Sequence, residues 1–280
     1  MRFAKYHGLG NDFIMIADLD DRLELDRTLV RRLCDRRLGI GGDGLIRVAP
    51  GRNGATFFMD YVNSDGSVGE MCGNGIRCLA LFARAEGMFD GDRLTVDTRA
   101  GLKVLDIRGD SVTVDMGPPI FVPDRIPVKW QGSNALDAKI ELQSGTVSVA
   151  CLSMGNPHAV MFVDDPDAAP VATMGPLIER HNAFPHGTNV EFAVVESPGL
   201  VRMRVWERGP GETLACGTGA CAVAVAARSL RGTNEQVTIV TPGGELSIEW
   251  RGSVDDEEPV LMTGPALEAF SGEVDLDRLG

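Results

Sequence analysis

The chain repeats itself, and this internal duplication limits its possible folds more than any other feature. Motifs from the first half return in the same order about 144 residues later, the distance between Cys72 and Cys216. The matching segments are 10–21 with 155–166, 71–78 with 215–222, 98–102 with 241–245, and 116–120 with 262–267. Four ordered matches at a nearly constant offset predict two homologous halves, each of ordinary domain size.

The boundary between the halves is expected near the proline-rich stretch 116–127. We therefore expect an N-terminal half over residues 1–117 and a C-terminal half over residues 118–264. The last segment, 265–280, is expected to pack back onto the first half.

Each half shows the same order of patterns. Strand-like runs come first, then a Gly-rich turn, one helix, and further alternating strands. The expected strands include 13–16, 57–62, 94–97, 159–163, 201–206 and 237–241. The helix after Cys216 is apolar on every side, which is typical of a buried helix. The predicted class is α+β, with each half a mixed sheet or barrel curled around a central helix.

A second type of helix is expected at 26–38, where leucines lie on one side and arginines on the other. We interpret its arginine row as a solvated surface.

Composition excludes several classes of function. The net charge of −13 is unsuited to non-specific binding of nucleic acid or anionic membranes, which need a basic face. The N-terminus lacks the apolar region of a secretory signal, and no apolar run has the length of a membrane span. We expect a cytoplasmic protein with reduced cysteines.

Two familiar motifs are rejected on their context. The six cysteines show no CxxC spacing, so a structural zinc site is not expected. Residues 39–44 fit GxGxxG, but a helical pattern precedes them and a strand pattern follows. A dinucleotide site needs the reverse order, so nucleotide binding is not expected either.

Cys72 and Cys216 occupy equivalent places in the duplication, each directly before Gly-x-Gly at an expected helix start. A helix N-terminus carries exposed N–H groups and partial positive charge, which suit a carboxylate and favour a thiolate. Two such turns acting on one α-carbon could remove a proton with one sulfur and deliver one with the other. The alternative is that cysteines are simply small core residues, and we adopt it for Cys34, Cys78, Cys151 and Cys221.

At these residues the chain resembles the diaminopimelate epimerases over nearly its whole length. The motifs that carry the resemblance are HGLGNDF from residue 7, GIGGDGL from 39, NSDGS from 63, MCGNGIRC from 71, MGNPH from 154, TNVEF from 188 and ERGPGETLACGTGA from 207.

The resemblance implies interconversion of LL- and meso-2,6-diaminopimelate on the route to lysine and peptidoglycan precursors. It implies no pyridoxal phosphate, metal or other cofactor, and a homodimer of chains with two barrel-like halves. No nucleic acid or membrane partner is implied; the partner is the small-molecule substrate.

The resemblance also assigns residues. Cys72 and Cys216 match the acid/base pair, and His158 and Glu207 match residues that organise proton transfer. Substrate-binding positions are Asn11, Gly44, Asn63, Gly73, Asn74, Asn156, Asn189, Glu207, Arg208, Gly217 and Thr218. Some family members have glutamine where this chain has Gly44, so only its backbone is expected to contribute. Arg208 offers a planar fork for a distal carboxylate, and asparagines can bind both ammonium and carboxylate groups.

Two other functions remain open from the sequence. One is a racemase of another amino acid, such as proline or hydroxyproline, for which Arg208 and the asparagines have no evident use. The other is a redox or metal-binding protein that uses the same cysteines, which leaves the glycines at the helix starts without a purpose.

Overall fold

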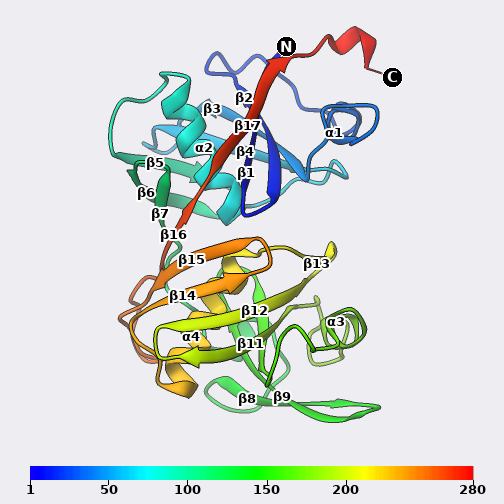
Figure 1. Cartoon of the computed structure of the whole chain (residues 1–280), viewed down its shortest axis with the longest axis vertical. Coiled ribbons are helices and arrows are strands. Elements are labelled where there is room, and N and C mark those ends of the chain that lie inside the picture. The colour runs from blue at the N-terminus through cyan, green and yellow to red at the C-terminus, as the bar shows by residue number, and fades with distance from the viewer. Residues whose placement is uncertain (280) are drawn as a thin grey trace. The chain divides into compact units, whose positions relative to one another are not determined.

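The computed structural model describes residues 1–279, which divide into two compact units. Residues 1–114 form the first unit together with the segment that begins at Thr263, and residues 115–262 form the second. The C-terminal strand thus belongs to the first unit (Figure 1).

Strands of the first unit form one row. In order they are β17 (Leu267–Glu273), β1 (Arg2–Gly8), β2 (Asn11–Ala17), β3 (Gly44–Pro50), β4 (Phe57–Asn63), β5 (Arg93–Thr98), β6 (Gly101–Arg108) and β7 (Ser111–Asp115), and β16 (Leu261–Pro265) pairs with β7. β2 runs parallel to β3, and β4 runs parallel to β5. The other pairs from β17 to β7 are antiparallel.

Strands of the second unit repeat this row. In order they are β8 (Ala135–Leu142), β9 (Gly145–Ser153), β10 (Pro157–Phe162), β11 (Asn189–Ser197), β12 (Leu200–Glu207), β14 (Gln236–Thr241) and β15 (Gly244–Glu249), and β13 (Gly211–Thr213) also pairs with β12. The parallel pairs are β10 with β11 and β12 with β14. Their positions match those of β2 with β3 and β4 with β5, so the duplication in the sequence is a duplication of the fold.

Helices also occupy equivalent places. α1 (Arg27–Cys34) and α3 (Val171–Glu179) connect the first parallel pair of each unit, while α2 (Gly73–Ala85) and α4 (Gly217–Arg231) connect the second. α2 contacts strands towards both ends of its row, β17 and β6 among them, and α4 contacts strands from β9 to β15. Each sheet therefore curls around its own helix, as predicted (Figure 1).

The central helices are buried because their side chains are small or apolar. In α4 every residue from Gly219 to Ala227 is buried, in a run of Gly, Ala, Cys and Val. Short side chains let the surrounding strands approach the helix backbone closely. α4 then ends at Gly232, whose φ of 68° is the left-handed conformation that glycine favours.

The first peripheral helix is shorter than the 26–38 prediction. α1 starts after the N-cap Asp26 and ends at Cys34. The Asp35 carboxylate accepts hydrogen bonds from the backbone N–H groups of Arg37 and Leu38, so a side chain–backbone turn replaces the last helical turn. Leu38, which the helical pattern placed on the apolar side, is 77% exposed.

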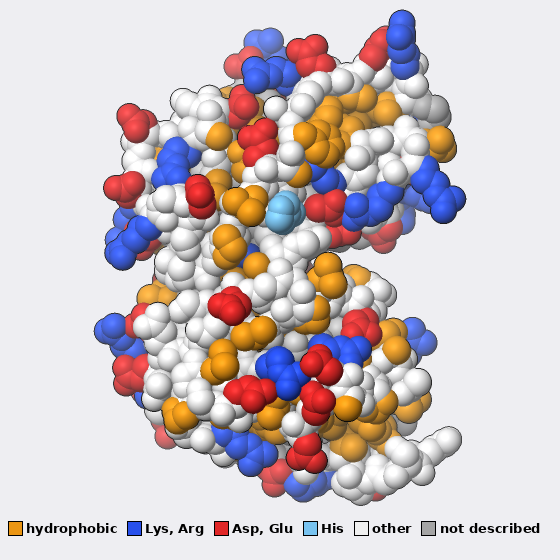
Figure 2. Space-filling model, viewed as in Figure 1, with side chains coloured by type: hydrophobic (Ala, Val, Ile, Leu, Met, Phe, Trp, Pro, Cys, Tyr) orange, Lys and Arg blue, Asp and Glu red, His pale blue; other side chains and the backbone are white. Residues whose placement is uncertain are grey.

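Charges of both signs are interspersed over the face seen in Figure 2, without an extended basic patch. In the part of the chain that the structure describes, none of the helices is long and apolar enough to cross a membrane.

Candidate active site

Cys72 is the N-cap residue of α2, with an extended backbone (φ −135°, ψ 121°) and no capping hydrogen bond from its side chain. The first helical bond runs from the N–H of Ile76 to the carbonyl of Cys72. Gly73, Asn74 and Gly75 thus form the first turn, where backbone N–H groups lack helical partners. The thiol therefore lies beside the partial positive charge of the helix start.

Cys216 has the same local geometry at the start of α4. It is the N-cap residue with φ −122° and ψ 114°, and Ala220 donates the first helical bond to its carbonyl. Gly217, Thr218 and Gly219 complete the turn, and the Thr218 hydroxyl lies 3.5 Å from the Cys216 sulfur. The two turns that the sequence singled out are therefore built alike.

Around Cys72 the structure brings Asn11 and Asn74 together. The Asn11 amide oxygen lies 3.5 Å from the Cys72 sulfur and accepts from the Asn74 amide at 3.3 Å. The Asn74 oxygen accepts from Arg77 at 2.8 Å, and Arg77 also donates to the carbonyl of Gly73. Arg77 is fully buried, so this guanidinium fixes the helix start from within. Sequence reasoning did not single out Arg77.

Asn11 is held by an ionic cluster that the sequence prediction missed. Its amide donates to Asp43 at 2.7 Å, and Arg36 binds both Asp43 and Asp12. Buried Lys5 binds Asp12 at 2.8 Å. Arg36 belongs to the arginine row predicted to be solvated, and its side chain is 57% exposed while it binds these carboxylates. These oppositely charged residues come from two segments that are separated in the sequence, which gave no sign that the segments meet.

Gly44 and Asn63 lie opposite each other where β3 meets β4. A Cβ at Gly44 would approach Tyr61 Cε2 to 2.7 Å and the Val62 carbonyl oxygen to 2.8 Å. Tyr61 thus occupies the space that a side chain at position 44 would need, which explains the glycine. Its hydroxyl donates to the Asn63 amide oxygen at 2.5 Å, while the Asn63 amide nitrogen donates to the Ser67 hydroxyl.

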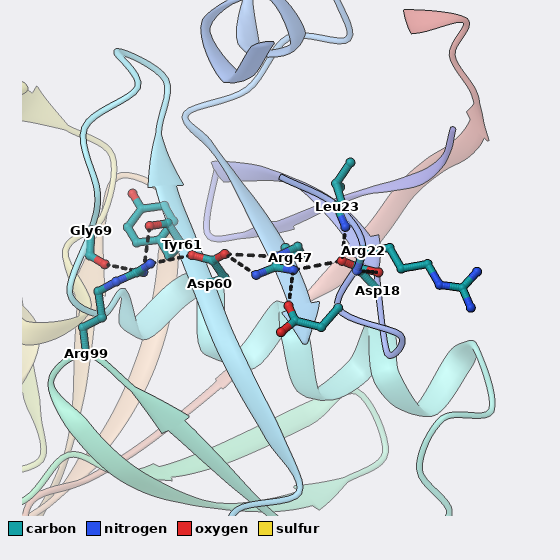
Figure 3. A network of polar contacts seen from close by, with 9 residues as sticks. Asp18, Arg22, Leu23, Arg47, Asp60, Tyr61, Gly69 and Arg99 are labelled. Carbon is teal, nitrogen blue, oxygen red and sulfur yellow. Dashed lines mark hydrogen bonds and ion pairs between the residues drawn. The ribbon is translucent and has the colours of Figure 1, made fainter. Parts of the chain in front are cut away.

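The segment before Cys72 is tied to the sheet by the ion-pair network of Figure 3. Arg47 on β3 binds three carboxylates, those of Asp18, Asp21 and Asp60. The second oxygen of Asp60 binds Arg99, which also reaches the carbonyl of Gly69 at 3.4 Å. This network therefore holds the loop that leads into the cysteine turn.

In the second unit, His158 connects Asn156 with an acidic residue absent from the sequence prediction. Its Nε2 lies 3.0 Å from the Asn156 amide oxygen, and its Nδ1 lies 2.6 Å from Glu191 Oε1. His158 and Glu191 are both fully buried. Glu191 is part of the TNVEF motif, but its place within a strand pattern gave no reason to predict it as a site residue.

Asn189, Glu207 and Arg208 meet where β11 and β12 pair. The Asn189 amide donates to the Pro157 carbonyl and accepts from the backbone N–H of Arg208 at 2.9 Å. Glu207 accepts from the Thr213 hydroxyl at 2.5 Å. Arg208 is exposed and donates to the His186 carbonyl through Nη1. Asn189 thus positions the backbone that carries Arg208.

Electrostatics at Cys216 differ from the expectation that a helix start favours thiolate. Burial raises the pKa of the Cys216 thiol well above its ordinary value, and the negative charges of Glu207 and Glu191 raise it further. Hydrogen bonds from Thr218 and the Gly219 N–H lower it, without overcoming burial. The sequence did not decide which cysteine is the thiolate, and the raised pKa of Cys216 favours its thiol form at neutral pH.

The other cysteines lie in the core, as expected. Cys34, Cys78, Cys151 and Cys221 are all buried, and burial raises the pKa of Cys34 and of Cys151 to about 12. Within residues 1–279, no three His, Cys, Asp or Glu side chains are grouped in a way that could hold a metal ion.

Comparisons with known proteins agree on one family. A family model described as diaminopimelate epimerase matches residues 3–122 and 150–268. A diaminopimelate epimerase of Moorella thermoacetica is 48% identical over 99% of this chain and 100% of its own length. One from Thioalkalivibrio sulfidiphilus is 45% identical over 99% of each chain.

Solved structures share the fold at lower identity. A hydroxyproline epimerase from Agrobacterium vitis matches with a TM-score of 0.72 and 18% identity, covering 98% of this chain and 90% of its own. A phenazine biosynthesis protein of the PhzF family from Bacillus anthracis matches with a TM-score of 0.73 and 14% identity, covering 98% and 99%. These likenesses concern the architecture alone.

The raised pKa of Cys216 predicts slow alkylation at neutral pH. Thiolate is the reactive form, so the rate at Cys216 should rise only above the ordinary thiol range of about 8.5. Glu207→Gln removes a negative charge and should shift this rise to lower pH. Iodoacetamide labelling followed by peptide mass spectrometry measures it, with Glu212→Gln as control. A wild-type midpoint at or below the ordinary value would contradict the account.

Proposed function

Because this chain belongs to the diaminopimelate epimerase family, we propose that Cys72 and Cys216 together invert one α-carbon of 2,6-diaminopimelate, converting the LL to the meso form. The chain is then an isomerase that serves lysine and peptidoglycan precursor synthesis. The observation that carries the proposal is the matched geometry of two helix starts, each with a cysteine at the N-cap position before Gly-x-Gly.

Inversion of an α-carbon requires a proton to leave one face and another to arrive at the opposite face. One base on each face achieves this without moving the substrate. Each sulfur in the proposed pair sits beside its own helix N-terminus, so the backbone N–H groups of Gly73, Asn74, Gly217 and Thr218 would receive the reacting carboxylate. As the α-proton leaves, negative charge grows on that carboxylate, and oriented N–H groups stabilise it most at that point.

The two thiols enter the reaction differently. Burial and nearby carboxylates raise the pKa of Cys216, which favours its thiol form. It is therefore suited to deliver a proton. In the reverse direction Cys216 must accept one, and the substrate's ammonium group beside it would favour the thiolate through its charge.

Recognition of the distal end is proposed for Arg208 and the asparagines. The Arg208 guanidinium is exposed and uses one nitrogen for the His186 carbonyl, so its fork can still bind a carboxylate. Asn156 is half-buried beside His158. Asn11 and Asn63, held by Asp43 and Tyr61, would present fixed amides to an ammonium or carboxylate group.

Racemisation of proline or hydroxyproline is the runner-up, since a hydroxyproline epimerase shares the fold. The exposed fork of Arg208 favours the diacid, because a monocarboxylate leaves it unused. A homodimer, which rests on the resemblance alone, and a cytoplasmic location, which rests on the sequence pattern, complete the proposal.

Substrate selectivity tests the activity. The purified protein should interconvert LL- and meso-diaminopimelate without added cofactor and leave L-proline unchanged, because a proline ring offers nothing to Arg208. Chiral chromatography of both incubations measures this. Racemisation of proline without turnover of diaminopimelate would support the runner-up instead.

Single cysteine variants test the pair. Cys72→Ala and Cys216→Ala should each lower kcat by about 10³-fold or more, because each removes one acid/base group. Cys78→Ala and Cys151→Ala, the matched core controls, should keep kcat and lower the free energy of unfolding by about 1 kcal/mol through lost packing. A fully active Cys72→Ala or Cys216→Ala protein would refute the assignment, as would loss of activity in a folded Cys78→Ala protein.

A further inference from the structure

Glu191 is a buried carboxylate that the two-cysteine scheme does not use. We propose that Glu191 is a positioning residue that shares one proton with His158 beneath Cys216 and sets the protonation pattern of that histidine during epimerisation. The inference deepens the proposed function and rests on it for the role in turnover, whereas the shared proton itself does not depend on the substrate.

The first argument is that the Glu191 carboxyl is buried although one of its oxygens lacks a hydrogen-bond partner among the described residues. Glu191 is fully buried, and its Oε2 finds no hydrogen-bond partner within residues 1–279. A lone carboxylate in such a place is costly. Desolvation raises the pKa of Glu191 against the opposing effect of His158. The group must therefore be protonated or paired with a cation, and His158 is its only neighbour at ion-pairing distance among the described residues.

The hydrogen bonds of His158 show how many protons the pair holds. His158 Nε2 lies 3.0 Å from the amide oxygen of Asn156, an acceptor, so Nε2 carries a hydrogen. His158 Nδ1 lies 2.6 Å from Glu191 Oε1. This contact needs one proton, held either on the carboxyl or on Nδ1. Both arrangements contain the same number of protons and leave the pair neutral, so the pair shares a single proton.

The pair also lies near the reacting cysteine, since Glu191 and Cys216 border the same space beside Gly219. A Cβ at Gly219 would be 2.9 Å from Glu191 Oε1 and 3.4 Å from the Cys216 sulfur. The missing side chain of Gly219 thus lets the carboxyl approach the thiol. Other titratable groups around Glu191 are Cys151 on β9 and Glu207 on β12. Neither supplies positive charge, so His158 alone can balance Glu191.

The first unit shows that the fold does not require this pair. In the parallel pair of β10 and β11, His158 lies opposite Asn189, and in the equivalent pair of β2 and β3, Phe13 lies opposite Gly44. By this register, His158 corresponds to Phe13, and Glu191 corresponds to Ile46. The glycines of the two helix starts confirm this match. A Cβ added at Gly75 would lie 2.6 Å from Ile46 Cδ1, just as one added at Gly219 would lie 2.9 Å from Glu191 Oε1. Phe13 and Ile46 are fully buried. An apolar pair therefore fills the same place beneath Cys72, and the ionisable pair is special to the Cys216 side.

Two variants separate a chemical role from a structural one. Glu191→Gln keeps the shape and the hydrogen bond to Nδ1 but cannot share a proton, and Glu191→Asp keeps the carboxyl but is shorter. A chemical role predicts that kcat falls by about 10²-fold in Glu191→Gln and less in Glu191→Asp. Neither variant should change KM by more than about twofold, because Glu191 does not touch substrate. Glu196→Gln, on the exposed end of the same strand, is the control.

A structural role predicts the opposite order, with Glu191→Gln close to wild type and Glu191→Asp impaired by the space it leaves. That order, or unchanged kcat in Glu191→Gln, would overturn the proposal. Thermal unfolding is measured alongside, and Glu191→Gln should be at least as stable as wild type because it replaces a buried ionisable group with a neutral side chain of the same shape.

A proton NMR spectrum tests the shared proton without substrate. The wild-type protein should show a strongly deshielded, solvent-protected resonance that disappears in His158→Phe, the variant that copies the first unit, and in Glu191→Gln. Its absence from wild type would overturn the proposal even if the variants did not fold. Inactivity of the wild type towards diaminopimelate, with this resonance present, would instead refute the proposed function and leave the proton-sharing pair standing.

Discussion

Burial of one helix inside each curled sheet is the constraint on which the rest of the structure depends. Small side chains let the strands close around α4, while α2 is enclosed with larger apolar side chains and the buried Arg77. A helix buried along its length can expose its polar backbone only at its ends. Both N-termini begin directly after a cysteine, so one packing arrangement creates the anion-attracting turn and places the thiol beside it.

The duplication makes the two turns alike, and the residues beneath them make the two cysteines different. Under Cys72 lie Phe13 and Ile46, while under Cys216 the same positions hold His158 and Glu191. Around Cys72 the polar groups are amides and a fixed ionic cluster, in which Asp12 has a pKa held low by hydrogen bonds to Arg36 and Lys5. The proposed two-base reaction needs one sulfur to give up a proton as the other accepts one, and the unlike surroundings would provide this difference.

Sequence patterns predicted those features of the fold that depend on repeated motifs or on the periodicity of apolar residues. The duplication, the buried helix after Cys216 and the α+β class follow from such patterns, and the two cysteine turns follow from the chemistry of a helix start. Long-range polar partners were not predictable, since Asn11 meets Asp43, and His158 meets Glu191, only through parallel strand pairing. The predicted length of α1 was wrong because the Asp35 side chain competes with the helix for backbone N–H groups. The protonation of Cys216 could not be predicted, because burial, which raises its pKa, depends on the tertiary structure.

The location of deuterium after brief turnover tests the two-cysteine account most directly. LL-diaminopimelate is incubated with the protein in D2O, stopped at low conversion, and both isomers are analysed by mass spectrometry and NMR. Delivery of a proton from a second thiol on the opposite face predicts meso product that carries deuterium at the inverted α-carbon, with remaining substrate still protonated. Equal deuterium in substrate and product at early times would show a single base that exchanges with solvent, and would contradict the account.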